Sequence, residues 1–250
     1  MKENTSAAKG KGSPGISLRF VLVRSRIALN MGAAARALSN FGFSDLVAVE
    51  PAANGWREAK SAIYASELLE KTPVLSLEEA VADRHLILGT ASLHNRAHRR
   101  TTVDLGALSG WLKRRLPKGG RVAILFGSET NGLANEELDY CHAVIRIPTV
   151  PNAPSMNLGQ AVALVAYELA RSGLERSVAE PEERLAEGVQ LYEWVETAMR
   201  AMAETGVNAH MPEKVRRARF RRGLLKWRMS RADANWLHGL LSKLLKGRDP

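Results

Sequence analysis

Five short apolar runs between residues 18 and 147 constrain the fold more than any other feature of this 250-residue sequence. Each run is rich in Val, Ile and Leu and shows little alternation of polar and apolar positions. Strands of this kind are buried on both faces, as in a parallel sheet that helices cover. The expected strands are Leu18–Val23, Leu46–Glu50, His85–Gly89, Val122–Phe126 and Ala143–Ile147.

Helical patterns separate these runs, so an α/β domain is expected over residues 17–174. The helix Leu158–Ala170 is apolar on nearly every side, which predicts that it is buried. The other expected helices of this domain are Gly32–Asn40, Arg57–Leu69, Ser76–Ala82, Leu105–Leu116 and Asn135–Tyr140.

The two ends of the chain differ from this pattern. Residues 1–16 are rich in Lys, Ser and Gly, which predicts a disordered tail. Residues 175–186 are polar and predict a linker to a small basic helical domain over residues 187–250. Its expected helices are Arg184–Glu204, Pro212–Trp227 and Ser230–Lys246, the last opened by a capping box of Ser230 and Asp233.

The charge balance favours a polyanionic partner. The chain has 36 Lys and Arg against 26 Asp and Glu, a net charge of +10, and nucleic acid is the commonest such partner. Its single cysteine, Cys141, excludes an internal disulfide and a cysteine-based zinc cluster. No apolar stretch reaches the roughly 18 residues of a membrane span. We therefore expect a cytoplasmic protein without membrane or metal.

Four segments near the ends of predicted strands carry the candidate chemistry: Asn30–Arg36, Gly89–Ser92, Phe126–Gly132 and Ile147–Asn157. Ligands of open α/β sheets gather at strand carboxyl ends. Each segment alone is equally compatible with a helix start, a plain loop or a helix cap. The dinucleotide, P-loop, zinc-protease and serine-hydrolase signatures (GxGxxG, GxxxxGK[ST], HExxH, GxSxG) are absent from the sequence.

In this order the segments resemble the SpoU-type RNA 2′-O-ribose methyltransferases of the SPOUT superfamily. Asn30, Gly32 and Arg36 match the first motif of that family, LFGSETNGL the second and IPTVPNAPSMNLGQAVALVAYE the third. The whole chain looks most like the bacterial TrmJ branch, which methylates nucleotide 32 in the tRNA anticodon loop. GTAS before a basic segment, NEELDYCHAVIRIP and the C-terminal helical extension carry that likeness.

The resemblance implies a SPOUT fold: a mostly parallel sheet with helices on both faces and a C-terminal trefoil knot, an exception to the rule against knots. It implies a homodimer, with Leu158–Ala170 near the interface, and S-adenosyl-L-methionine as the cofactor. The implied cofactor-binding residues are Thr90, Ala91, Ser92, Leu125, Gly127, Gly132, Ile147, Ser155, Met156 and Leu158. The implied catalytic residues are Arg36, Asn30, Glu129, Ser155 and Asn157.

The family assigns removal of the ribose hydroxyl proton to the arginine at position 36. A guanidinium with a pKa above about 12 is almost never neutral. The alternative is that Arg36 orients a phosphate or stabilises the developing alkoxide while another group takes the proton.

A basic segment near the C-terminus is the candidate RNA-binding surface. Nine Lys and Arg lie between Lys214 and Arg231, although a solvated helix face is the plainer interpretation. Phe220 and Trp227 stand at helical core spacing, and we expect them in the core rather than stacked on a base. The predicted RNA-binding residues are Arg24, Arg96, Arg99, Arg100, Lys214, Arg216, Arg217, Arg221 and Arg228.

The sequence thus predicts an enzyme that methylates a ribose 2′-hydroxyl of tRNA. Three alternatives stay open. One is the same reaction on rRNA, against which the helical extension at the C-terminus rather than the N-terminus favours tRNA. Another is an RNA-binding protein that kept the fold but lost the activity; the intact motif residues argue against it, because such a protein does not need them. The last is a small-molecule α/β enzyme, which would leave the basic helix unexplained.

Overall fold

The computed structural model describes residues 15–91, 100–117, 119–173, 188–227 and 229–246. Their first part forms a seven-stranded sheet in the order β3-β2-β1-β6-β4-β7-β5, and every neighbouring pair is parallel. The strands are β1 (Ser17–Val23), β2 (Leu46–Val49), β3 (Val74–Leu75), β4 (Leu86–Thr90), β5 (Thr102–Asp104), β6 (Arg121–Phe126) and β7 (Ala143–Arg146). The five predicted strands are confirmed to within a residue or two at each end.

The strands β3 and β5 escaped prediction. They have two and three residues, and each lies at an edge of the sheet. Val74 and Thr102 are exposed, so neither segment shows the continuous apolar run that marks a central strand.

The helices of the α/β part are α1 (Ala28–Asn40), α2 (Ser66–Glu70), α3 (Leu77–Val81), α4 (Leu108–Lys113), α5 (Asn135–Leu138) and α6 (Leu158–Arg171), with 3-10 turns η1 (Trp56–Glu58) and η2 (Leu105–Ala107). The prediction of one helix over Arg57–Leu69 is wrong. That segment comprises η1, an irregular stretch and α2, and Tyr64 adopts a left-handed backbone with φ +63°, which a continuous helix excludes.

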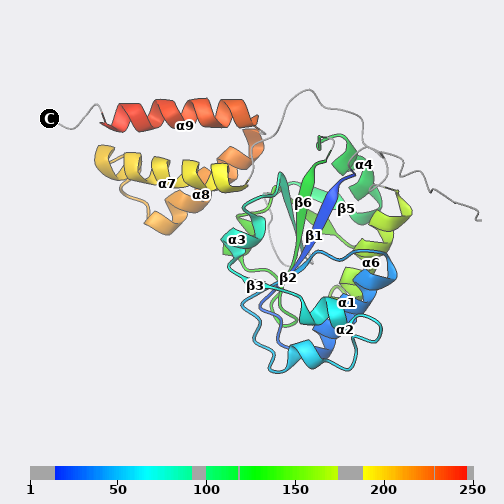
Figure 1. The fold of residues 1–250 in the computed structure, drawn as a ribbon. Coiled ribbons are helices and arrows are strands. Elements are labelled where there is room, and N and C mark those ends of the chain that lie inside the picture. Colours follow the sequence, from blue (N-terminus) through cyan, green and yellow to red (C-terminus); the bar gives the residue numbers. More distant parts are fainter. Residues whose placement is uncertain (1–14, 92–99, 118, 174–187, 228, 247–250) are drawn as a thin grey trace, which may run out of the picture.

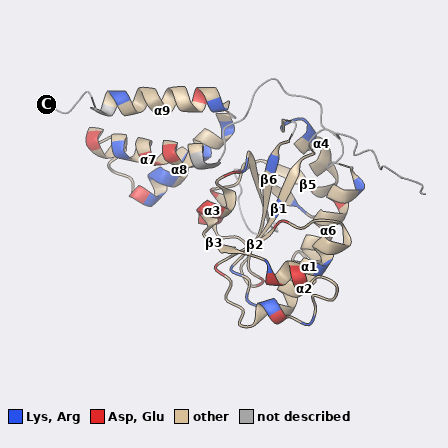
Figure 2. Ribbon diagram, in the orientation of Figure 1, with Lys and Arg blue, Asp and Glu red and all other residues tan. Residues whose placement is uncertain are grey.

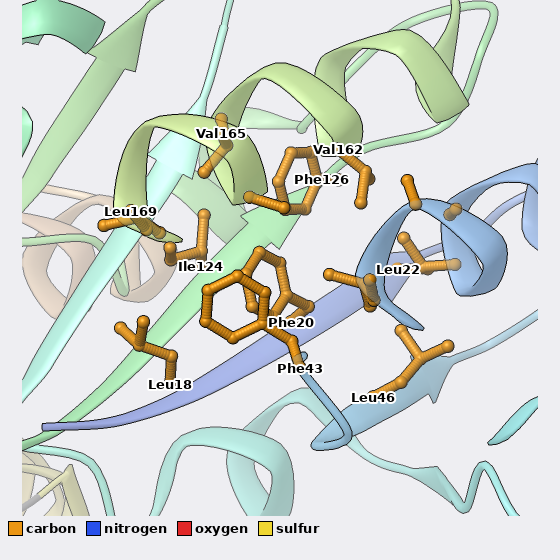
Figure 3. Packing of buried hydrophobic residues seen from close by; sticks show 14 of the residues in the cluster. Leu18, Phe20, Leu22, Phe43, Leu46, Ile124, Phe126, Val162, Val165 and Leu169 are labelled. Atoms are coloured by element: carbon orange, nitrogen blue, oxygen red, sulfur yellow. The ribbon is translucent and has the colours of Figure 1, made fainter. Parts of the chain in front are cut away.

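Helices cover both faces of the sheet, as predicted (Figure 1). Phe20, Ile124 and Phe126 belong to a hydrophobic cluster with α1, α4 and α6, whereas the alternate residues Val21 and Leu125 pack with α3 and α5. In Figure 3, Val162, Val165 and Leu169 of α6 lie over the phenylalanines, and the Phe20 ring centroid is 5.1 Å from that of Phe43. The alternation follows from the two-residue period of a strand.

The helix α6 is buried on one face only, which corrects the expectation of burial all round. Val162 and Val165 are fully buried against the sheet, but Leu164 is 38% exposed and Tyr167 is 50% exposed. A helix that covers one face of a sheet leaves its outer side in solvent unless another body covers it.

The parallel order places four strand ends side by side. Because β6 lies between β1 and β4, and β7 lies beyond β4, the segments that follow these strands emerge at one edge of the sheet. Three of the four candidate segments of the sequence follow β4, β6 and β7, and the fourth begins α1 after β1. The trefoil knot stays a prediction.

Three C-terminal helices form a small unit with its own core: α7 (Gly188–Thr205), α8 (Glu213–Trp227) and α9 (Arg231–Lys246). Trp194, Val195 and Leu224 are buried in that core. The Ser230 hydroxyl accepts from the Asp233 amide at 3.0 Å, so the predicted cap of the last helix is present. Among the described helices none is long and apolar enough to cross a membrane. The predicted tail (apart from residues 15 and 16) and the linker lie outside the described residues.

Candidate functional site

A cavity of about 330 Å³ opens at the carboxyl ends of β4, β6 and β7. Its walls are the turn after β4, the loop after β6 and the segment that leads from β7 into α6. Eight of the ten predicted cofactor-binding residues line this cleft: Thr90, Ala91, Gly127, Gly132, Ile147, Ser155, Met156 and Leu158. Ser92 lies outside the described residues.

The side chain of Leu125 does not line the cleft, and the predicted contact of its backbone with the cofactor stays a prediction. Its side chain is fully buried on the opposite face of the sheet, because it alternates with Phe126, which does line the cleft. The backbone of Leu125 still contributes, since its carbonyl accepts a hydrogen bond from the Thr90 hydroxyl at 3.1 Å.

The loop after β6 is closed on itself by two glycines. A Cβ added at Gly127 would stand 2.0 Å from the carbonyl carbon of Gly132 and 2.1 Å from the Leu133 nitrogen. Gly132 has φ +63°, and its amide donates to the Ser128 carbonyl at 2.8 Å. Gly127 is therefore required by the loop's own backbone, and its predicted contact with the cofactor stays a prediction.

Sequence reasoning missed further lining residues of the cleft, among them Thr130, Asn131 and Thr149. Each of them lies within the second or third motif, so its position in the motif could have predicted that it lines the cleft. Their side chains carry hydroxyl and amide groups, which offer hydrogen bonds to a polar ligand.

The Glu129 carboxylate accepts four hydrogen bonds from the segment between β1 and α1. The donors are the Ser25 hydroxyl at 3.0 Å, the Arg26 amide at 2.9 Å, the Ile27 amide at 3.2 Å and the Asn30 side-chain amide at 2.9 Å. This carboxylate thus fastens the loop after β6 to the start of α1.

The same network continues to the third motif. The Asn157 side-chain amide donates to the Asn30 side-chain oxygen at 2.8 Å, and the Asn157 oxygen accepts from the Gly159 amide at 2.9 Å. Asn157 is therefore the N-cap of α6, as the sequence allowed, and it is also the last member of a chain Glu129–Asn30–Asn157. Donors and acceptors alternate along this chain, which determines the orientation of both asparagine amides.

The network sets the ionisation of Glu129. Burial raises the pKa of this carboxyl, but hydrogen bonds from the Arg26 amide, Asn30 and Ser25 outweigh it, so the pKa lies below its ordinary value. Glu129 is ionised at neutral pH with its oxygens occupied by donors. It is a positioning residue, and it is unsuited to act as a proton acceptor.

Arg36 stands apart from this network. It is exposed on α1, about 9 Å along the helix axis from Asn30 and turned by roughly 240°. Within the described part of the chain no hydrogen bond or ion pair holds its guanidinium. Ser155 lines the cleft and is exposed. The catalytic roles of Arg36 and Ser155 stay predictions.

Comparison with known proteins adds to this geometry. The sequence profile of the SpoU rRNA Methylase family matches residues 17–167, which include the whole sheet and the cleft. The chain belongs to the SpoU rRNA Methylase family.

Relatives place this SpoU protein near a particular branch. It is 30% identical to the tRNA (cytidine/uridine-2'-O-)-methyltransferase TrmJ of Pectobacterium atrosepticum, over 93% of this chain and 98% of that protein. It is 36% identical to the TrmJ of Pseudomonas aeruginosa over 61% of this chain and 60% of that protein. The crystal structure of TrmJ from Z. mobilis ZM4 matches with a TM-score of 0.78 and 29% identity, over 90% of this chain and 98% of that chain. The predicted family, fold class and enzyme class are confirmed.

The cations predicted to bind RNA fall into two groups in this SpoU protein, and most are engaged by its own side chains. Arg24 makes two bonds to Glu137 at 2.6 and 3.0 Å, and Lys214 pairs with Glu136 at 2.6 Å. Arg100 pairs with Asp139, Arg217 with Glu196 and Glu213, and the Arg221 guanidinium lies 3.9 Å from the centroid of the Tyr140 ring.

The remaining predicted cations are Arg216, Arg96, Arg99 and Arg228. Arg216 has no ion pair within the described residues, and the other three lie outside them. Figure 2 shows Lys and Arg along α8, the helix that contains most of the basic segment predicted to bind RNA. Among the described residues, Lys214 and Arg221 thus tie α8 to the α/β part, whereas Arg216 has no ion pair.

Glu129→Gln tests the network. The glutamine amide would face the Arg26 and Ile27 amides, so we expect a loss of about 1–3 kcal/mol in the free energy of unfolding at about pH 7. Since the folded-state pKa of Glu129 is lowered from 4.5, its contribution is full above that pH and is lost as pH falls through the folded value. Urea denaturation should therefore show a smaller difference below about pH 4.

The control for this variant is Glu70→Gln, which removes an exposed carboxylate at the end of α2. An undiminished difference at low pH, or a loss equal to the control at neutral pH, would show that Glu129 does not hold the loop through its charge.

Proposed function

We propose that this protein transfers the methyl group of S-adenosyl-L-methionine to a ribose 2′-hydroxyl of tRNA. The observation that carries the proposal is the hydrogen-bonded chain Glu129–Asn30–Asn157, which joins all three motifs of the family beside the cleft. The TrmJ relatives, named for cytidine and uridine 2'-O-methylation of tRNA, support the substrate. Nucleotide 32 of the anticodon loop as the target rests on the resemblance, and a cytoplasmic location rests on the single cysteine, Cys141.

The cleft suits this cofactor in charge and in shape. Among its described lining residues Glu129 is the one ionisable side chain, and it is ionised. S-adenosyl-L-methionine carries a sulfonium and an ammonium against one carboxylate, so its net charge is complementary. Ile147, Met156 and Leu158 offer an apolar surface for the adenine, and the loop from Gly127 to Gly132 offers backbone polar groups.

When bound, the cofactor supplies a methyl group on a positively charged sulfur. The residues of this chain bind and orient, and such orientation is worth up to about 7–11 kcal/mol of the barrier. Arg36 stabilises the negative charge that develops on the ribose oxygen, or holds the adjoining phosphate, as an exposed cation without a partner among the described residues. Glu129 is a weak base for the hydroxyl proton, because four hydrogen bonds to its carboxylate lower its pKa.

Arg36→Ala tests this role. We expect kcat for methyl transfer to tRNA to fall about 10²–10³-fold, because one donor to developing charge is removed. Cofactor affinity, measured by isothermal titration, should stay within about twofold, since Arg36 does not line the cleft. Mass spectrometry of the digested RNA then locates the methyl group made by the unaltered protein.

The matched control is Arg114→Ala, which removes an exposed arginine at the end of α4. An equal loss of cofactor affinity in Arg36→Ala would show that the site has been misassigned. A methyl group found in rRNA and not in tRNA would show that tRNA is not the substrate, but it would not contradict methyl transfer to a ribose.

We propose that unpaired cations of α8 hold RNA phosphates. Arg219 and Lys226 are exposed and have no ion pair among the described residues. Replacing both by Ala should make the dependence of log affinity on log salt shallower by roughly two, because each phosphate contact contributes about one. Replacing Lys214 and Arg222, which pair with Glu136 and Asp139, is the control and should change the slope less. Affinity that is flat with salt in the unaltered protein contradicts phosphate binding.

We also propose a homodimer that covers the outer face of α1 and α6. Leu29, Leu164 and Tyr167 are exposed there, and the two helices pack together (Figure 1). Light scattering should give twice the chain mass of 27.4 kDa. Leu164→Glu should yield monomer, because a charge would be buried in an apolar interface. Leu244→Glu, on α9, is the control and should leave the dimer intact. A monomeric unaltered protein would refute the assembly.

A further inference from the structure

The helix α8 presents two opposite faces of different character. Lys214, Arg217 and Arg221 lie on one face and are held by carboxylates or by the Tyr140 ring. On the other face, Arg216, Arg219, Gly223 and Trp227 follow the helical spacing i, i+3, i+7 and i+11. This second stripe lines a cavity of about 280 Å³.

The opposite wall of this cavity comes from α7 and the turn before α8. Met202 and Met211 supply flexible apolar surface, and Asn208 supplies an amide. No carboxylate is among the described residues that line the cavity. A Cβ built at Gly223 meets nothing within 4 Å, so the space beside the helix is open.

The two arginines of the stripe have unused hydrogen-bonding capacity. Neither has an ion pair within the described residues, and the Arg216 Nε is buried without a hydrogen-bond partner. A buried donor without a partner is costly, and an incoming acceptor removes that cost. Phosphate oxygens are suited to a guanidinium, which binds them through two parallel bonds.

Trp227 completes the cavity with an aromatic surface. Its side chain is 61% exposed, so the sequence prediction that it belongs to the core is wrong, whereas Phe220 packs against the core as predicted. Trp227 is the last residue of α8, where fewer neighbours cover a side chain. Exposed aromatic rings stack on unpaired bases, and nearby cations bind the phosphates, in many proteins that bind single-stranded nucleic acid.

We propose that this cavity binds one unpaired nucleotide of the RNA substrate, the base against Trp227 and a phosphate on Arg216 and Arg219. A volume of about 280 Å³ is near the lower end of ligand cavities, roughly 300 Å³, which suits a single flat base. The inference rests on the proposed function only in that the substrate is RNA. It gives the C-terminal unit a preference for loops over duplexes, which phosphate contacts alone do not provide.

The test compares two tryptophans of the same unit in the full-length protein. Trp227→Ala should weaken binding of tRNA roughly tenfold, because stacking on one base is lost, and should leave binding of a fully paired RNA duplex unchanged. Trp236→Ala removes an indole of similar exposure, 66%, from α9 and should leave both affinities unchanged, since Trp236 does not line the cavity. Equal effects of the two replacements would overturn the proposal.

A second pair of variants fills space and removes no contact. Gly223→Leu places a side chain in the cavity, and we expect a loss in tRNA affinity similar to that of Trp227→Ala. The fold is preserved, because leucine is a better helix former than glycine and a Cβ at Gly223 meets no atom within 4 Å. Gly239→Leu, on α9, is the control, because a Cβ at Gly239 also meets nothing within 4 Å. Unchanged tRNA affinity in Gly223→Leu would overturn the proposal.

A third measurement separates this proposal from the proposed activity. A short single-stranded RNA oligonucleotide should quench the tryptophan fluorescence of the unaltered protein and of Trp236→Ala, and should quench Trp227→Ala far less. If this quenching pattern is found but the protein methylates no RNA, the proposal of a nucleotide site stands and the proposed methyltransferase activity is refuted. Equal quenching of all three proteins, with tRNA methylation intact, would retain the activity and refute the site.

Discussion

The Glu129 carboxylate joins segments that lie about a hundred residues apart in the chain, and the rest of the site depends on that junction. It accepts hydrogen bonds from residues separated from it by 99 to 104 positions. Those bonds exist because β6 is inserted beside β1, so the loop after β6 and the start of α1 leave the sheet at the same edge. Asn30 and Asn157 extend the junction to the N-terminus of α6.

The network of Glu129, Asn30 and Asn157 does not include Arg36. The hydrogen bonds of Glu129, Asn30 and Asn157 hold the loop after β6, the start of α1 and the N-terminus of α6 together. Arg36 lies on the same helix as Asn30, and no hydrogen bond or ion pair among the described residues holds its guanidinium.

The acids of the segment after the cleft loop give the C-terminal unit its connection to the α/β part. Glu136 forms an ion pair with Lys214 of α8, and Asp139 forms ion pairs with Arg222 of α8 and with Arg100. These ion pairs use one face of α8 and leave the opposite face with Trp227 and unpaired arginines. A helix that the sequence presents as uniformly basic therefore divides into an internal contact and an open surface.

Local patterns in the sequence determined the central strands, the caps of α6 and α9 and the segments after β4, β6 and β7 that line the cleft. A strand buried on both faces needs a continuous apolar run, and a cap needs a particular side chain at a particular place. The same patterns failed where burial depends on distant residues. They joined η1 and α2 into one helix, buried α6 on all sides and put Trp227 in the core.

Only the tertiary structure decided which charged side chains form ion pairs and which glycine is required because there is no room for a side chain. Arg24 and Arg216 look alike in the sequence, but one meets Glu137, which lies 113 residues away, and the other meets no carboxylate among the described residues. The sequence does not show that the backbone at Leu133 leaves no room for a side chain at Gly127, because a Cβ there would stand 2.1 Å from the Leu133 nitrogen. Pairing and close approach are properties of two segments at once, so a pattern within one segment does not contain them.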